Sequence, residues 1–116
     1  MTPPPAEYVP DRGDLVWFDF DPQAGREQGG RRPAIVLSRS SYNGPSGLAL
    51  VCPITSRVKG YPFEMQLPSG LPVSGVVLVD HVKSADWRVR RAERVGAAPL
   101  EFVAAVLKRL NVLFAP

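Results

Sequence analysis

The stretch DLVWFDF, residues 14–20, predicts a β-strand because it combines aromatic and β-branched residues. A second strand is expected over residues 33–38, PAIVLS, whose short apolar run is typical of a strand buried on both faces. The charged segment EQGGRRP, residues 27–33, completes a connection of about a dozen residues between them, although a hairpin needs only a few. This connection is either a solvated surface loop or a loop built for contact with an anionic partner.

Beyond these two strands, turn residues and apolar runs alternate along the chain. The sequence YNGPSG, residues 42–47, is typical of a turn. Four more strands are expected, and the last belongs at a sheet edge because its charged and apolar residues alternate: residues 48–54, with Pro53 near the end, then 63–67, 75–79 and 89–95.

An amphipathic helix is predicted at the C-terminus, where apolar residues recur every three or four positions: Leu100, Val103, Leu107, Leu110 and Phe114. A second apolar stripe, formed by Phe102, Val106 and Leu113, indicates that this helix has two partners, its own sheet and a second subunit. We therefore predict a mainly β fold with a C-terminal helix, as a small SH3-like barrel or strongly bent antiparallel sheet, assembled as a homodimer.

The composition indicates one domain. The 116 residues suffice for a single core, with residues 1–7 expected as a disordered N-terminal tail and residues 8–116 as the folded domain. No apolar run approaches the ~20 residues of a membrane span, and the N-terminus lacks the regions of a signal peptide. We therefore expect a cytoplasmic protein that does not associate with membranes. The single cysteine, Cys52, excludes an internal disulfide and is expected to be a small buried hydrophobe.

The net charge of +3 permits nucleic-acid binding without proving it. The basic residues gather beside predicted loops, in three groups at positions 26–39, 57–59 and 88–94. Several such loops on one rim of a small barrel would form an anion-binding face. The alternative is that these charges only keep the surface solvated.

Few residue types that carry chemistry are available. One histidine and one cysteine exclude a zinc site of the usual spacing, and no phosphate-binding Gly-Lys-Ser/Thr loop is present, so no metal or cofactor is expected. His81 follows a predicted strand end, where a structural or partly exposed imidazole is expected.

The remaining candidates suit metal-free cleavage of RNA. In that reaction a carboxylate such as Glu27 takes the proton of a ribose 2′-hydroxyl. An arginine such as Arg32 stabilises the charge that builds on the phosphate, and Thr55 adds a hydrogen bond to a phosphate oxygen. Charged loops are common, so a purely structural role for these residues stays open at this point.

The order and spacing of several motifs resemble the MazF/PemK toxin family. The resemblance spans roughly residues 8–113 and rests on these segments: YVPD at 8–11, GDL at 13–15, WxDFDP at 17–22, EQxGxRPAxVLS at 27–38, YN at 42–43, KGYPFE at 59–64, DxVKS at 80–84 and NVL at 111–113. It implies the fold of the CcdB/MazF/PemK group and a homodimeric toxin of a type II toxin–antitoxin system. Such a toxin is a sequence-specific endoribonuclease that cuts single-stranded mRNA without a metal, inhibits translation, and is neutralised by a cognate MazE-like antitoxin.

The resemblance also assigns roles to individual residues. It implies that Arg32, Glu27 and Thr55 are catalytic, with Glu27 either the base or a residue that positions Arg32. It matches Asp80 and Lys83 to a family motif, and the candidates for substrate binding are Arg31, Gln28, Lys59, Tyr61, Asp80 and Lys83. Relatives of the PemK type carry an arginine two residues before the aspartate, where this chain has Leu78. The chain therefore follows the MazF branch, and Asp80 is expected to hold loops by hydrogen bonds rather than to transfer protons.

Two other classes of function are kept as alternatives. A CcdB-like gyrase poison shares the fold, but it relies on a tryptophan near the C-terminus, and this chain ends LFAP at residues 113–116. A non-catalytic SH3-like binding module would need an exposed aromatic groove and no Glu27–Arg32 pair.

Overall fold

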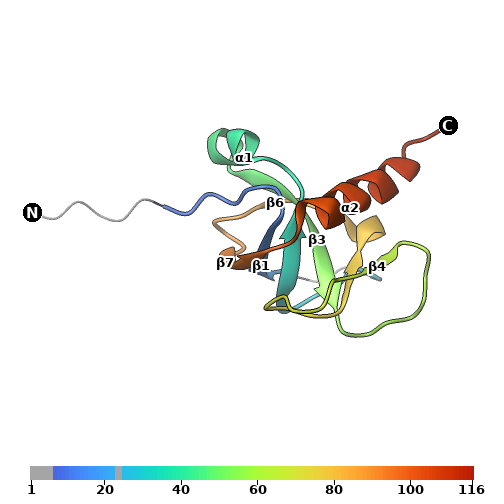
Figure 1. The fold of residues 1–116 in the computed structure, drawn as a ribbon. Helices are drawn as coiled ribbons and strands as arrows, with labels where there is room; N and C mark the ends of the chain where they lie inside the picture. The colour runs from blue at the N-terminus through green and yellow to red at the C-terminus, as the bar shows by residue number, and fades with distance from the viewer. Residues whose placement is uncertain (1–6, 23–24) are drawn as a thin grey trace, which may run out of the picture.

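The computed structural model describes residues 7–22 and 25–116 (Figure 1). The expected tail of residues 1–7 therefore lies outside the described residues, except for Glu7. The Glu7 carboxylate accepts a hydrogen bond from Arg88 Nε at 2.7 Å, so this last residue of the expected tail is attached to the domain.

Within the described residues the strands form a seven-stranded antiparallel sheet in the order β4-β5-β3-β2-β1-β7, with β6 paired to β3. The strands are β1 Asp14–Asp19, β2 Arg31–Val36, β3 Leu48–Thr55, β4 Glu64–Gln66, β5 Val76–Leu78, β6 Lys83–Asp86 and β7 Glu93–Ala97. The helices are α1 Ser40–Ser46, the 3-10 turn η1 Val79–His81 and α2 Leu100–Val112. The predicted fold class, a mainly antiparallel β-sheet with a C-terminal helix, is confirmed.

Strand β3 is the central strand of the sheet because it pairs with three neighbours. One edge pairs with β2. The other edge pairs with β6 along its first half, from Leu48 to Val51, and with β5 at its end, at Ile54 and Thr55. The sheet therefore divides along β3, and Thr55 lies at the end of this central strand.

Alternation along the strands produces one core on each face of the sheet. Leu15 and Ile35 lie in the core beneath α2, which crosses the sheet in Figure 1, whereas Val16 and Phe18 lie in the core on the opposite face. Cys52 is fully buried beneath α2, as predicted, and burial raises the pKa of its thiol to about 12.

The turn predicted at 42–47 was wrong, because residues Ser40–Ser46 form the short helix α1. A buried asparagine fixes this helix through contacts distant in sequence. The Asn43 side-chain amide donates to the carbonyls of Pro10 and Ser38, at 2.8 and 2.9 Å, and its backbone carbonyl accepts from Trp87 Nε1 at 2.8 Å. These partners override the local turn preference.

Two predictions about the last strands need correction. Strand β6 was not predicted, because its four residues are polar in three positions. The last strand begins at Glu93 rather than residue 89, because residues 87–91 form a turn. Its predicted position at the sheet edge is confirmed by the strand order.

Helix α2 packs on the sheet through the middle of the predicted stripe and part of the second stripe, but not through the ends of the first. Val103 and Val106 are buried, with Phe102, Leu107 and Leu110 packed against the same core. Leu100 and Phe114, the two ends of the predicted stripe, are 85% and 73% exposed. No helix within the described ranges is long and apolar enough to cross a lipid bilayer.

Candidate active site

Two adjoining hollows lie where the ends of β2 and β3 meet η1. The small pocket, about 500 Å³, contains Phe20, Pro53, Val82 and Lys83, and the wide cleft, about 1010 Å³, contains Arg32, Thr55, Arg57, Lys59 and Tyr61. Five residues line both hollows: Arg26, Glu27, Gln28, Asp80 and His81. All the predicted site residues except Arg31 therefore line one or both of them.

Arg32 occupies the second position of β2, not the loop before the strand. Its side chain is half-buried, and its Nε donates to the carbonyl of Gly29 at 2.9 Å. This bond orients the guanidinium in the wide cleft. The terminal nitrogens carry four further N–H donors in a fork that matches the oxygens of a phosphate.

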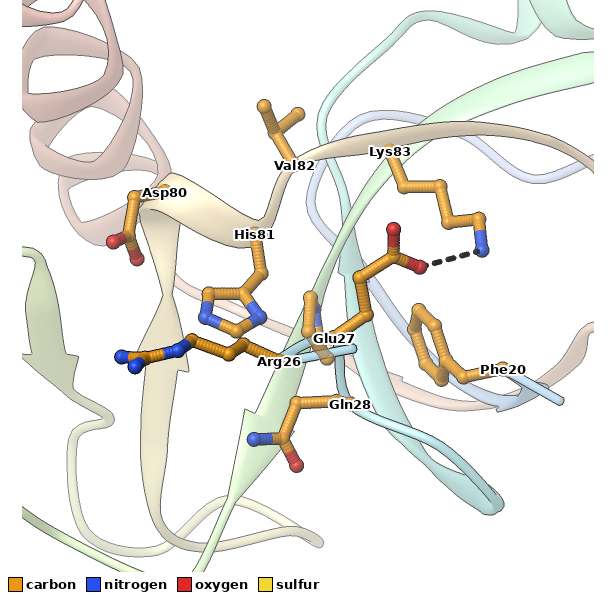
Figure 2. Close-up of a pocket in the computed structure, with 9 residues that line it drawn as sticks. Phe20, Arg26, Glu27, Gln28, Asp80, His81, Val82 and Lys83 are labelled. Carbon is orange, nitrogen blue, oxygen red and sulfur yellow. Dashed lines mark ion pairs between the residues drawn. The ribbon is translucent and has the colours of Figure 1, made fainter. Parts of the chain in front are cut away.

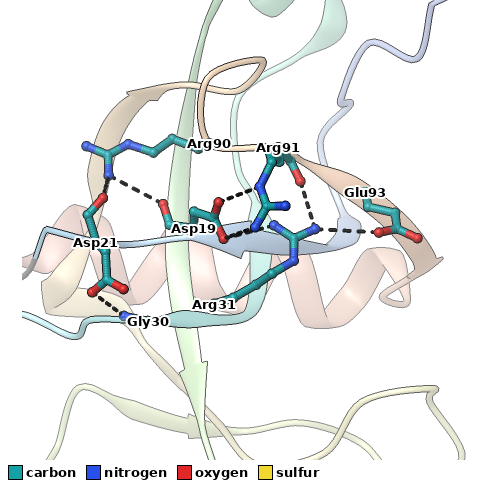
Figure 3. Close-up of polar contacts among 7 residues, drawn as sticks. All are labelled: Asp19, Asp21, Gly30, Arg31, Arg90, Arg91 and Glu93. Atoms are coloured by element: carbon teal, nitrogen blue, oxygen red, sulfur yellow. Dashed lines mark hydrogen bonds and ion pairs between the residues drawn. The ribbon is translucent and has the colours of Figure 1, made fainter.

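Arg31 turns away from both hollows, because successive residues of a strand face opposite sides. Its guanidinium donates to Asp19 Oδ1 at 3.1 Å and to the carbonyl of Arg91 at 2.9 Å (Figure 3). Arg91 and then Arg31 hold the pKa of the Asp19 carboxyl below its usual range. The structure therefore does not bring Arg31 to the predicted substrate-binding surface.

Glu27 pairs with Lys83 and not with Arg32. Its Oε2 lies 3.9 Å from Nζ of Lys83, and in Figure 2 its carboxylate points toward that lysine. Within the described residues no ion pair joins Glu27 to Arg32, which is held by Gly29 instead. The alternative in which Glu27 positions Arg32 therefore has no contact in this structure.

Thr55 presents a hydroxyl to the wide cleft. Its side-chain oxygen accepts from the backbone N–H of Arg57 at 3.1 Å, which leaves the hydroxyl proton for donation to a ligand. Gly75 lies against this residue so closely that a Cβ built there would be 2.3 Å from the Thr55 carbonyl oxygen. The position of Thr55 therefore depends on the absence of a side chain at Gly75.

The rim of the wide cleft includes Lys59 and Tyr61, which is 61% exposed. The carboxylate of Glu64 accepts hydrogen bonds from the backbone N–H groups of Lys59 and Gly60, at 3.0 and 2.8 Å. Arg109 of α2 donates to the carbonyl of Pro62. Sequence reasoning did not single out Glu64, although it stands five residues after Lys59 in a segment that carried the family resemblance.

Asp80 and Gln28 line both hollows, whereas Lys83 lines only the small pocket. Asp80 is exposed there, and no hydrogen bond to its carboxylate is formed within the described residues, so the loop-holding role expected for it has no contact in this structure. His81 is half-buried as expected, but it also lines both hollows, which sequence reasoning missed. The described residues contain no group of three or more His, Cys, Asp or Glu side chains arranged to hold a metal ion.

Residues 11–114 match the sequence profile of the PemK-like, MazF-like toxins of type II toxin–antitoxin systems. The chain belongs to this family. An endoribonuclease toxin MazF of Escherichia coli K12 is 49% identical over 108 residues, covering 93% of this chain and 96% of that protein. The endoribonuclease toxin ChpB of the same strain is 41% identical, with 89% and 92% covered.

Solved structures of the family have the same fold. MazF of Deinococcus radiodurans superposes with a TM-score of 0.90 at 60% identity, covering 93% of this chain and 98% of that one. A MazE–MazF complex from the same organism gives a TM-score of 0.83 at 54% identity, with 94% and 98% covered. The resemblance drawn from the sequence is confirmed.

Proposed function

We propose that this endoribonuclease toxin cuts single-stranded mRNA at specific sequences, without a metal ion, and that the wide cleft holds the scissile phosphate. The activity class comes from relatives that are named endoribonucleases. The observation that carries the rest is the convergence of Arg32, Thr55 and Glu27 on one cleft. Neither alternative, a gyrase poison or a binding module, accounts for this convergence.

The proposed reaction begins with attack by the ribose 2′-oxygen on the adjacent phosphorus. Glu27 accepts the 2′-hydroxyl proton, while the terminal nitrogens of Arg32 and the hydroxyl of Thr55 donate to the phosphate oxygens as charge develops on them. The products are a 2′,3′-cyclic phosphate, or the 3′-phosphate formed from it, and a 5′-hydroxyl. Lys59, Tyr61 and Gln28 line the wide cleft and are assigned to contact nucleotides beside the cleavage site, with Tyr61 exposed enough to stack on a base.

Cleavage of a defined RNA should proceed unchanged in excess EDTA and leave 5′-hydroxyl ends. The reason is that every step above is assigned to a side chain of this chain. The measurement is gel analysis of end-labelled RNA, with treatment by a 5′-kinase to identify the new ends. Products that carry a 5′-phosphate, or activity abolished by EDTA, would show that the reaction is a different one.

The working unit is a homodimer. Leu100, Val112 and Phe114 are 85%, 56% and 73% exposed on and just beyond α2, and two-fold association buries identical surfaces on both partners. Multi-angle light scattering at micromolar concentration should give twice the 12.6 kDa mass of the chain. Leu100→Glu should shift the protein toward monomer, whereas a wild-type sample that is monomeric throughout would end the proposal.

A MazE-like antitoxin neutralises the toxin, as the solved MazE–MazF complexes of relatives indicate. We propose that an acidic segment of it competes with RNA for the basic rim, because the side chains that attract phosphates also attract carboxylates. Apolar anchors beside Trp17, which is 37% exposed, would supply most of the affinity, since exposed ion pairs contribute only ~0–1 kcal/mol each. In this proposal the toxin acts in the cytoplasm, where mRNA is translated.

Saturating antitoxin should displace a fluorescent, uncleavable RNA from the toxin. Arg32→Glu should weaken the binding of both partners, because both use the same cation. The measurement is fluorescence anisotropy in titrations with each partner. A ternary complex in which RNA stays bound at full antitoxin occupancy would place the inhibitory surface elsewhere.

A further inference from the structure

His81 lies in the candidate site, but the proposed reaction gives it no role. It is the last residue of η1, it is half-buried, and it lines both hollows. Figure 2 shows its imidazole extending from η1 into the hollow, toward the segment that carries Arg26 and Glu27. Within the described residues no hydrogen bond or ion pair occupies the ring, so its nitrogens are open to a ligand.

The proposed reaction needs a proton donor as well as a base. When the 2′-oxygen attacks, the bond between phosphorus and the 5′-oxygen breaks, and that oxygen leaves readily only if it gains a proton. Glu27 accepts a proton in the same step and cannot supply this one. The arginines of the cleft keep their protons, and Lys83 lines only the small pocket, where it pairs with Glu27.

Histidine suits the missing task, because it is the side chain that ordinarily changes charge closest to neutral pH. His81 and Glu27 both line the junction of the two hollows, beside the cleft that holds Arg32 and Thr55. A base and an acid therefore stand next to the place assigned to the phosphate, on different segments of the chain. Asp80, the neighbour of His81, is the matched residue for comparison.

We propose, building on the function proposed above, that His81 is the catalytic acid that protonates the leaving 5′-oxygen. As the bond between phosphorus and the 5′-oxygen breaks, the imidazolium gives its proton to that oxygen, which becomes the 5′-hydroxyl. Glu27 holds the proton taken from the 2′-hydroxyl, and the new bond from the 2′-oxygen to phosphorus closes the cyclic phosphate. Exchange of both protons with water restores the starting state.

Charges of both signs surround the imidazole, so a pH profile of the wild type cannot by itself identify the acid. The charged groups that share its hollows come from six elements: Arg26 and Glu27 before β2, Arg32 on β2, Arg57 and Lys59 after β3, Glu64 on β4, Asp80 on η1 and Lys83 on β6. The deciding comparison is therefore between two substrates that differ only in the leaving atom.

The test uses single-turnover cleavage of one RNA and of the same RNA with sulfur in place of the bridging 5′-oxygen at the cleavage site. A thiolate leaves without a proton, so the sulfur substrate does not need the acid. His81→Gln should slow the ordinary RNA by about 100-fold or more, and the sulfur substrate by no more than about threefold on the same reasoning.

The control variants separate this role from a structural one. Asp80→Asn should slow both substrates by the same factor, and His81→Asn should repeat the behaviour of His81→Gln if the latter melts below the wild type. Equal slowing of both substrates in both His81 variants, or an undiminished rate on ordinary RNA, would overturn the proposal. A wild-type protein that cleaves neither substrate would instead overturn the proposed function itself.

Discussion

Arg32→Ala should lower the rate constant for RNA cleavage by roughly 100- to 1,000-fold, the loss seen when one donor that stabilises transition-state charge is removed. The guanidinium is held in the wide cleft by the bond from its Nε to Gly29, and its terminal nitrogens are the donors assigned to the phosphate. The rate is measured under single-turnover conditions, so that slower binding or product release does not hide the effect. Circular dichroism of the variant checks that the fold is kept.

Arg31→Ala provides the matched control for this experiment. It removes the same side chain from the adjacent position of β2, but from the face that contacts Asp19 and Arg91. Its cleavage rate should stay within about tenfold of the wild type, because no proposed step uses this residue and exposed ion pairs contribute little. A loss in Arg31→Ala as large as that in Arg32→Ala would show that strand alternation does not separate their functions.

Gly75→Ala should destabilise the protein by roughly 2–6 kcal/mol, the sum of backbone strain and overpacking. Gly75 has φ of +121°, a backbone conformation that residues with a side chain rarely adopt. An added Cβ would lie 2.3 Å from the Thr55 carbonyl oxygen. The end of β3 would have to move, and the hydroxyl of Thr55 with it, so activity should fall together with stability. Urea denaturation followed by tryptophan fluorescence measures the change.

Gly70→Ala isolates the backbone contribution. Gly70 also has a positive φ, +86°, but an added Cβ there would meet nothing within 4 Å. It should therefore cost only about 1–2 kcal/mol, the strain of a left-handed residue, and leave cleavage unchanged. Equal losses at the two glycines would mean that the close approach to Thr55 contributes nothing.

The local sequence pattern was sufficient to predict that the three central strands exist, because the residues that give each strand its character follow one another in the chain. β1 and β3 lie within one residue of their predicted bounds, whereas β2 begins and ends two residues earlier than predicted. α1 could not be predicted in this way, because its helix depends on the contacts of Asn43 with Pro10 and Trp87, 33 and 44 residues away. The ends of the stripe on α2 were wrong for a related reason: periodicity identifies an apolar face, but it does not say where the sheet beneath it ends.

In the candidate site, too, some residues could be predicted from the sequence and others depended on contacts distant in sequence. Glu27, Arg32 and Thr55 were predicted from their chemistry and from the family motif, and the structure gathers them in one cleft. Arg31 was predicted to contact substrate as one of the basic residues beside a loop, yet alternation along β2 directs it to the other face. His81 gave only a weak signal, a lone histidine after a strand, because its place between two hollows depends on how the segment before β2 folds against η1.

The contacts at the base of the segment between β1 and β2 have a consequence for how this enzyme can diversify. Asp19 pairs with Arg31 in the strand register, and the backbone N–H of Gly30 donates to Asp21 Oδ1 at 2.7 Å. These contacts join the two ends of the segment at its base, whatever the number of residues between them. Insertions or deletions between Asp21 and Gly30 would leave Arg32 in register but would shift Glu27, the proposed base, and Gln28. The residues that contact nucleotides could therefore diversify around a fixed Arg32, but the proton-transfer step would change with them. A crystal structure of a variant with one residue inserted after Gly25 would test this. A displaced Arg32 would show that these contacts do not hold the start of β2 in place.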